Sequence, residues 1–463
     1  MCTFVIWRIV MKIALFGAGS AQFGYGTLGD IFQSSVLRGA EIALMDINAE
    51  TLAMVHRTAE KHIADRGLDF TVTATTNRKE ALKGADFVII SIEVGDRFAL
   101  WDVDWKIPLQ FGVPQVYGEN GGPGGIFHAL RIIPPIMAIC DDVMEICPEA
   151  TVFNYSNPMT AITTTVLRKH PQLKFVGLCH EIASLERYLP PILGTELSNI
   201  QYRAAGLNHF SVLLEASYKD SGKDAYPDVL AKAPSFFERE PGFSEVWDYT
   251  RRTGEIPETE GATERWKMDI EESFRPWSDR TLFRRIMETY NLLPITTDSH
   301  LGEYIAWAQD ASDHKGILDF YDFYRHALGN RNWSEISEEM HERVVPIMDG
   351  IVSDSGYEES AVNILNKGAI PDFPNDVAVE VPAIVRGKGL EAVRFDQYPK
   401  GFGALIRNYA GVYDILADAV LSGSRDLVLQ AVLACPVVHR FEGMGDMVDT
   451  MLDAQRQWVG YIR

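Results

Sequence analysis

Short apolar segments alternate with longer amphipathic segments over the first 180 residues of the chain. Residues 86–91 are apolar and β-branched without alternation, which is typical of a strand buried on both faces of a parallel sheet. Residues 12–16, 41–46, 151–155 and 175–179 are further strand candidates, and residues 49–66 follow a helical pattern. Strands alternating with helices in this way predict a doubly wound, mostly parallel α/β sheet.

The loop after the first predicted strand carries two closely spaced glycines. Gly17 and Gly19 would let the backbone approach a pyrophosphate at the start of a helix, although Gln22 stands where a third glycine is usual. Asp46 ends the next strand without a following arginine, which favours NAD over NADP. The alternative is a tight turn beside a strand-end aspartate. The residues predicted to contact the cofactor are Gly17, Gly19, Ser20, Gln22, Asp46, Ser91 and Asn157.

The pattern changes near residue 200. Helical segments dominate after this point, with a few strand candidates such as residues 377–381. The sequence therefore predicts a Rossmann-like, NAD-binding domain over residues 11–200. A mixed α+β, mostly helical domain over residues 201–463 would bind substrate and metal and carry the oligomer contacts.

Composition narrows the class of protein. The formal net charge of −21 argues against binding nucleic acid or an anionic membrane. No apolar run approaches the roughly 18 residues that a membrane helix needs. Five cysteines form an odd, sparse set, which favours a reducing cytoplasm over a disulfide framework. Residues 1–10 lack the marks of a signal peptide, and we interpret them as an extension before a natural start at Met11.

Several polar groups are candidates for chemistry. Cys179 ends a predicted strand, and its thiolate would be a good ligand for a transition metal. His180 and His209 could join it, although thirty residues between ligands form no recognised metal motif. A buried, inert cysteine and structural histidines are the alternative.

Two further segments each allow two interpretations. In residues 297–304, Asp298 or Tyr304 could act as a base, but Asp298 could equally cap a helix. The glycine-rich residues 118–125 could form a mobile loop around cofactor and substrate, or a long surface turn.

The motifs taken together resemble glycoside hydrolase family 4, whose members use NAD and a metal rather than two carboxylates. The most specific are Asn-Tyr-Ser-Asn-Pro-Met at 154–159, Gly-Leu-Cys-His at 177–180 and Gly-Leu-Asn-His at 206–209. Residues 17–20, 122–126, 129–131 and 379–382, with Asp46, extend the resemblance over nearly the whole chain. It implies a lactate/malate dehydrogenase-like architecture and a homodimer or homotetramer.

The resemblance also implies a mechanism. NAD⁺ takes hydride from C3 of the sugar, a base removes the C2 proton, and the leaving group is eliminated before water adds and the hydride returns. Cys179 and His209 match the ligands of a metal, usually Mn²⁺, and Asp298 matches the base, with Tyr304 as a weaker candidate. His180 would protonate the leaving oxygen or hold the sugar.

The tetrad at residues 179–182, Cys-His-Glu-Ile, resembles the α-galacturonidase subgroup. A uronate needs a cation, for which Arg97, Arg131, Arg284 and Arg285 are candidates. The residues predicted to bind substrate are Asn157, Asn208, Arg97, Arg131, Glu119 and His300. The alternatives are the same mechanism on a neutral α-galactoside or α-glucoside, an NAD-dependent hydroxy-acid or sugar dehydrogenase, and an NAD-binding sensor without turnover.

Overall fold

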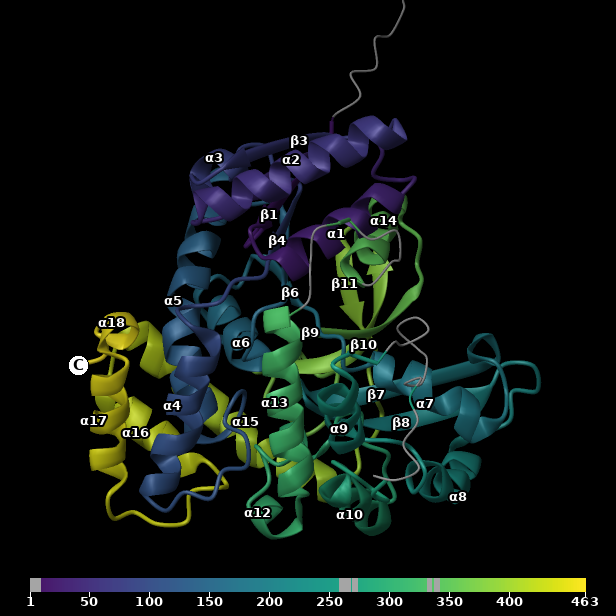
Figure 1. The fold of residues 1–463 in the computed structure, drawn as a ribbon, viewed down its shortest axis with the longest axis vertical. Coiled ribbons are helices and arrows are strands. Elements are labelled where there is room, and N and C mark those ends of the chain that lie inside the picture. Colours follow the sequence, from purple (N-terminus) through teal and green to yellow (C-terminus); the bar gives the residue numbers. More distant parts are fainter. Residues whose placement is uncertain (1–9, 258–267, 269–273, 331–334, 337–341) are drawn as a thin grey trace, which may run out of the picture.

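The computed structural model describes residues 10–257, 268, 274–330, 335–336 and 342–463, and Figure 1 shows the arrangement of their elements. The predicted extension over residues 1–10 lies almost wholly outside the described residues. All eleven strands in the described part of the chain belong to one sheet. They are β1 (Lys12–Phe16), β2 (Glu41–Met45), β3 (Thr71–Thr75), β4 (Phe87–Ile90), β5 (Thr151–Asn154), β6 (Lys174–Gly177), β7 (Ile200–Leu207), β8 (Phe210–Tyr218), β9 (Glu358–Leu365), β10 (Ala378–Arg386) and β11 (Gly389–Ala392).

Helices pack on both faces of this sheet (Figure 1). They are α1 (Ala21–Gln33), α2 (Ala49–Arg66), α3 (Arg78–Leu82), α4 (Arg97–Gln110), α5 (Gly122–Ile146), α6 (Met159–Lys169), α7 (Ala183–Leu193), α8 (Tyr226–Phe237), α9 (Phe243–Thr253), α10 (Thr281–Tyr290), α11 (Asp298–Leu301), α12 (Ala308–Ala311), α13 (His314–Asn330), α14 (Val344–Ser353), α15 (Lys400–Ser422), α16 (Arg425–Ala434), α17 (Met444–Ala454) and α18 (Arg456–Val459).

The first six strands are parallel and run in the order β3-β2-β1-β4-β5-β6. This is the order of a dinucleotide-binding, doubly wound sheet, so the predicted fold class is confirmed. In β1, Ile13 and Leu15 pack in one hydrophobic cluster while Ala14 and Phe16 pack in the other. Side chains on both faces of the strand are therefore buried, which explains its unbroken apolar run.

The sheet continues through strands of the second half. β6 pairs antiparallel with β9, and β10, β7 and β8 extend the sheet further. The predicted boundary at residue 200 is thus crossed by one sheet, and the assignment of separate domains stays a prediction. The second half also holds more strand than its helical pattern indicated, because β7 and β8 form a long hairpin.

One helix among the described residues, α5, is long and apolar enough to cross a membrane. Of its most apolar 18-residue window, 83% is buried inside the protein. Its side chains belong to the larger hydrophobic cluster, together with residues of β1 and β4. The length and apolar character of α5 therefore follow from its position in the core.

Candidate active site

The carboxyl ends of the parallel strands meet at one edge of the sheet. Asp46 follows β2, Ser91 follows β4, Asn157 lies shortly after β5, and Cys179 lies shortly after β6. Ligands of doubly wound sheets bind at this edge, where the strand order reverses. Two cavities open here, and they have Ser20, Ser91, Ile92 and Glu93 in common.

The first of these, which we call the nucleotide cleft, has a volume of about 580 Å³ and is lined by Gly17, Gly19, Ser20, Asp46 and Ser91. The Asp46 carboxylate accepts hydrogen bonds from the N–H groups of Gly19 at 2.8 Å and Asn48 at 2.9 Å. The structure thus places these predicted cofactor residues around one cleft beside the start of α1.

Glycine is required at the loop for steric reasons. Gly17 has a φ of +83°, and a Cβ there would lie 1.9 Å from the carbonyl oxygen of Ser91. At Gly24 a Cβ would lie 2.3 Å from the carbonyl oxygen of Ala18. Gly24 therefore lets α1 lie close against the loop that follows β1, two residues after the position where the usual pattern has its third glycine. Gln22 lies within α1, and its side chain is outside the described part.

The second, which we call the inner cavity, has a volume of about 430 Å³ and holds the predicted metal ligands. Cys179 Sγ lies 3.2 Å from Nε2 of His209. His209 occupies a two-residue turn between β7 and β8 and has a φ of +62°. Glu181, His209 and His300 each place one ligand atom within 4.8 Å of the other two, and Cys179 contacts this group through His209.

This donor set fits a divalent transition metal. The rings of His209 and His300 stack at 4.2 Å, and Nδ1 of each ring is buried without a hydrogen-bond partner. Burial lowers the pKa of His209 well below its usual value and raises the pKa of the Cys179 thiol. Imidazole binds metals in its neutral form, and a bound cation would deprotonate the thiol. Asn157 also lines this cavity, and its Oδ1 is buried and unpartnered.

His180 also lines the inner cavity, as predicted, and the structure adds an orienting partner. Its Nε2 lies 2.8 Å from Oε2 of Glu342, and its ring stacks on Tyr155 at 5.8 Å. Desolvation lowers the pKa of His180, but the carboxylates of Glu342, Glu181 and Asp30 together outweigh this effect and the net shift is upward. Sequence reasoning missed Glu342, because 162 residues separate it from His180.

Arg97 and Glu119 both line the inner cavity, and they pair with each other. Arg97 Nη2 lies 2.6 Å from Glu119 Oε1, and Arg97 Nε lies 4.0 Å from Glu93. The glycine-rich segment that carries Glu119 is buried throughout residues 118–125. Buried Glu303 accepts hydrogen bonds from the N–H groups of Glu119 and Asn120. The segment is therefore not a surface turn, and through Glu119 it contributes to the wall of the inner cavity.

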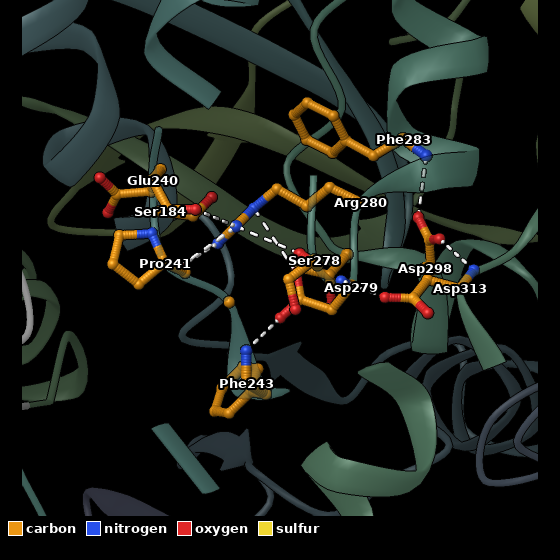
Figure 2. A network of polar contacts seen from close by, with 12 residues as sticks. Ser184, Glu240, Pro241, Phe243, Ser278, Asp279, Arg280, Phe283, Asp298 and Asp313 are labelled. Carbon is orange, nitrogen blue, oxygen red and sulfur yellow. Dashed lines mark hydrogen bonds and ion pairs between the residues drawn. The ribbon is translucent and has the colours of Figure 1, made fainter. Parts of the chain in front are cut away.

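The predicted base, Asp298, does not line the inner cavity. Its carboxylate accepts hydrogen bonds from the N–H groups of Leu282, Phe283 and Asp313 at 2.8–2.9 Å. Figure 2 shows the bonds from Phe283 and Asp313. Burial raises its pKa to about 7, although these three donors oppose the shift. Asp298 thus caps the start of α10, and its assignment as the base stays a prediction that this burial does not favour.

Other predicted residues also lie outside the inner cavity. The side-chain amide of Asn208 donates a hydrogen bond to buried Glu380 at 2.9 Å, and the backbone carbonyl of Asn208 accepts one from the Tyr304 hydroxyl. Asn208 and Tyr304 therefore hold in place the hairpin that carries His209. Arg131 forms a buried ion pair with Asp104, which accounts for its charge. Arg284 and Arg285, both in α10, pair with Glu288 at the surface.

A dinucleotide-binding type of fold with an adjoining cysteine–histidine cavity is typical of enzymes that use a nucleotide cofactor and a metal. Comparison of the sequence with models of known protein families identifies the family. Residues 12–195 match the model for family 4 glycosyl hydrolases, and residues 204–438 match the C-terminal domain of that family. The chain belongs to family 4 of the glycosyl hydrolases, as the sequence motifs indicated.

Relatives of known activity bear on the subgroup. An α-glucosidase of Erwinia rhapontici is 58% identical over 98% of this chain and 99% of its own length. An α-galacturonidase of Bacillus subtilis is 26% identical over 93% of this chain and 94% of its own length. The predicted galacturonide preference is therefore not supported, and the neutral α-glucoside alternative fits better.

Solved structures agree on the fold. A 6-phospho-β-glucosidase of Thermotoga maritima, with manganese, NAD⁺ and glucose 6-phosphate, is 21% identical. It superposes with a TM-score of 0.73 over 97% of this chain and 99% of its own. A malate dehydrogenase of Cryptosporidium parvum is 14% identical, with a TM-score of 0.51 over 89% of this chain and 99% of its own. The expected dehydrogenase-like architecture is confirmed.

Proposed function

We propose that this glycosidase hydrolyses a small neutral α-glucoside, using NAD⁺ in the nucleotide cleft and a divalent cation such as Mn²⁺ in the inner cavity. The carrying observation is that the two cavities share four lining residues, Ser20, Ser91, Ile92 and Glu93. A nicotinamide ring entering from the cleft would therefore face a sugar held beside Cys179 and His209. Both cofactors occur in the structure of the Thermotoga maritima relative.

The charge of the inner cavity supports a neutral sugar. Arg97 is the single arginine among its described lining residues, and Glu119 and Glu93 compensate its charge. Glu181 and Glu342 also line this cavity, so carboxylates outnumber the guanidinium. A uronate would have to enter an acidic cavity without a free arginine, which is costly. The 58% identical α-glucosidase supports glucose as the sugar.

Each residue of the inner cavity then has a role. Cys179 and His209 would bind the cation, with Glu181 and His300 within reach of it. When bound, the nicotinamide and the cation supply a reversible hydride acceptor and a Lewis acid for the sugar oxygens at C2 and C3. His180 would donate a proton to the leaving oxygen while Glu342 orients its ring.

A further contact would come from Asn157. Its buried Oδ1 has no partner in the protein and would accept a hydrogen bond from a sugar hydroxyl. Because an unpartnered buried acceptor is costly, the contact would contribute to substrate affinity.

The test compares p-nitrophenyl α-glucoside, α-galactoside and α-galacturonide, with NAD⁺ and Mn²⁺ omitted in turn. We expect the highest kcat/KM on the α-glucoside, loss of activity without either cofactor, and exchange of the C2 proton with solvent. A preference for the galacturonide would overturn the choice of sugar.

The same assay separates the alternative enzyme class. A dehydrogenase would accumulate NADH in proportion to substrate, whereas the proposed cycle returns the hydride. Full activity after chelation, or accumulation of NADH, would therefore exclude the proposed mechanism. The proposed cycle has no net oxidation, so it releases glucose itself. Glucose is measured separately from the released p-nitrophenol.

A further inference from the structure

The nucleotide cleft has a wall that comes from the far end of the chain. Trp458, in α18, lines this cleft together with residues of the strand-end loops and of α5. Helix α18 packs beside α5 (Figure 1). The matches to the two family models cover residues 12–195 and 204–438, so Trp458 lies outside both of them. Its place in the cleft is therefore a feature of this chain that the family motifs do not include.

Two buried contacts hold the segment around Trp458 in position. On one side, the Gln455 side chain is fully buried; its Nε2 donates to Asp104 at 2.6 Å, and its Oε1 accepts from Arg131 at 3.0 Å. On the other side, the hydroxyl of Tyr461 donates to the carbonyl oxygen of Leu130 in α5 at 2.9 Å. Because both anchors are in the protein core, the indole is held at the cleft by the fold itself.

The loop after β4 makes room for this indole. Gly95 has a φ of +69°, and a Cβ there would lie 2.8 Å from Cζ2 and 3.3 Å from Cε2 of Trp458. The six-membered ring of Trp458 therefore lies directly against the backbone of Gly95. Both residues line the nucleotide cleft, so the glycine and the tryptophan form one continuous piece of its wall.

The position of Trp458 along the cleft indicates which half of a dinucleotide it would meet. The nicotinamide end would lie at the residues that the cleft shares with the inner cavity. In doubly wound sheets, an aspartate in the position of Asp46 binds the ribose of the adenosine half. Five apolar residues line the nucleotide cleft but not the inner cavity, and they are Ile47, Val94, Pro135, Ile139 and Trp458. Ile47 follows Asp46 directly, so this apolar wall belongs to the adenine end.

We propose that Trp458 is a cofactor-binding residue and that its indole forms an apolar, aromatic wall for the adenine ring of NAD⁺. Contacts between an aromatic side chain and a base are strong and depend on the face of the base rather than on its hydrogen-bonding edge. The inference rests on the proposed place of NAD⁺ in the nucleotide cleft. Because the proposed cycle returns the hydride, NAD⁺ need not leave after each turnover, and a wall that slows its release does not limit kcat.

The experiment measures the binding of NAD⁺ and of ADP-ribose, which has the adenine but lacks the nicotinamide, by titration calorimetry. Trp458→Leu keeps apolar volume beside Gly95 but removes the aromatic face. We expect it to weaken both ligands by the same factor, about 10- to 100-fold. Trp458→Phe restores an aromatic ring and should bind both within about fivefold of the wild type. Trp307→Leu, exposed beside α12 and outside the cleft, is the matched control and should change neither affinity.

Tryptophan fluorescence gives a second measurement that needs no variant to fold. Trp458 is the single tryptophan among the described residues that line the cleft. Saturating ADP-ribose should therefore quench part of the tryptophan emission of the wild type, because a base in contact with an indole quenches it. The same quenching should appear in Trp307→Leu and be absent from Trp458→Leu.

The outcomes separate this inference from the proposed function. Unchanged affinities in Trp458→Leu, a loss confined to NAD⁺, or bound ADP-ribose that leaves the wild-type emission unchanged would overturn the adenine wall. A wild-type enzyme that binds neither NAD⁺ nor ADP-ribose in the calorimeter would instead overturn the proposed function, which places the dinucleotide in this cleft.

Discussion

Asp298 gives the sharpest test of the site, because two roles predict opposite results for one variant. Its carboxylate accepts three backbone hydrogen bonds, from Leu282, Phe283 and Asp313, and its side chain is fully buried. Asp298→Ala leaves three N–H groups without that acceptor. Each unpaired buried donor costs about 1–3 kcal/mol, and readmitted water together with relief of the buried charge offsets part of the sum. We expect the free energy of unfolding to fall by about 3–5 kcal/mol.

The assay is urea unfolding, followed by kinetics at a temperature where the variant is folded. Asp310→Ala is the control, since Asp310 is exposed in α12 and its loss should cost less than about 0.5 kcal/mol. Folded Asp298→Ala should keep kcat within about threefold of the wild type. An unchanged unfolding midpoint with kcat lowered by about 10²- to 10⁴-fold, as for a lost general base, would refute the capping role.

Three further predictions concern the metal, the cofactor and the pH dependence. Cys179→Ser should weaken Mn²⁺ binding by at least about tenfold in a titration calorimeter, whereas Cys147→Ser, away from the inner cavity, should not; equal affinities would exclude the thiolate as a ligand. Gly17→Ala should lower NAD⁺ affinity by more than about tenfold, because its Cβ would lie 1.9 Å from a carbonyl oxygen. Gly26→Ala, with open space around its Cβ, should bind NAD⁺ normally. Burial raises the pKa of Glu303 to about 8, above about 4.3 in the unfolded chain, so its contribution to stability is present below about pH 4 and is lost as the pH rises through 8. The free energy of unfolding of Glu303→Gln should therefore rise relative to that of the wild type between pH 5 and 8, by at most about 1.4 kcal/mol per pH unit. Urea unfolding at several pH values measures this difference, and a difference that does not change with pH would contradict the prediction.

Local signals in the sequence identified much of the nucleotide cleft. Gly17, Gly19 and Asp46 follow strands whose apolar runs are easy to recognise. Ser91 and Cys179 also lie just after strands, and the rule that ligands bind at strand ends fits their places in the two cavities. The same rule could have found Glu93, which lies three residues after β4 and lines both cavities. These features depend on a strand and the few residues after it, so a short stretch of sequence contains the information.

Residues far from their partners could not be assigned in this way. Asp298 is an acid beside a serine at a helix start, and nothing local distinguishes a base from a cap for a neighbouring helix. Arg131 was a plausible partner for a carboxylate, but Asp104 already pairs with it in the core. Glu342 joins His180 across 162 residues. Each role depends on which group the chain brings into contact, and long-range packing decides that.

The sequence by itself determined the family, the parallel half of the sheet and the chemical types at its carboxyl edge. Backbone sterics and burial act over a few residues, and they leave a readable pattern of glycines, apolar runs and strand-end polar groups. Only the tertiary structure decided which carboxylates are caps, which arginines are already paired and how the two cavities adjoin. Burial and pairing are properties of neighbours in space, and the β7–β8 hairpin and α10 bring such neighbours together from distant parts of the chain.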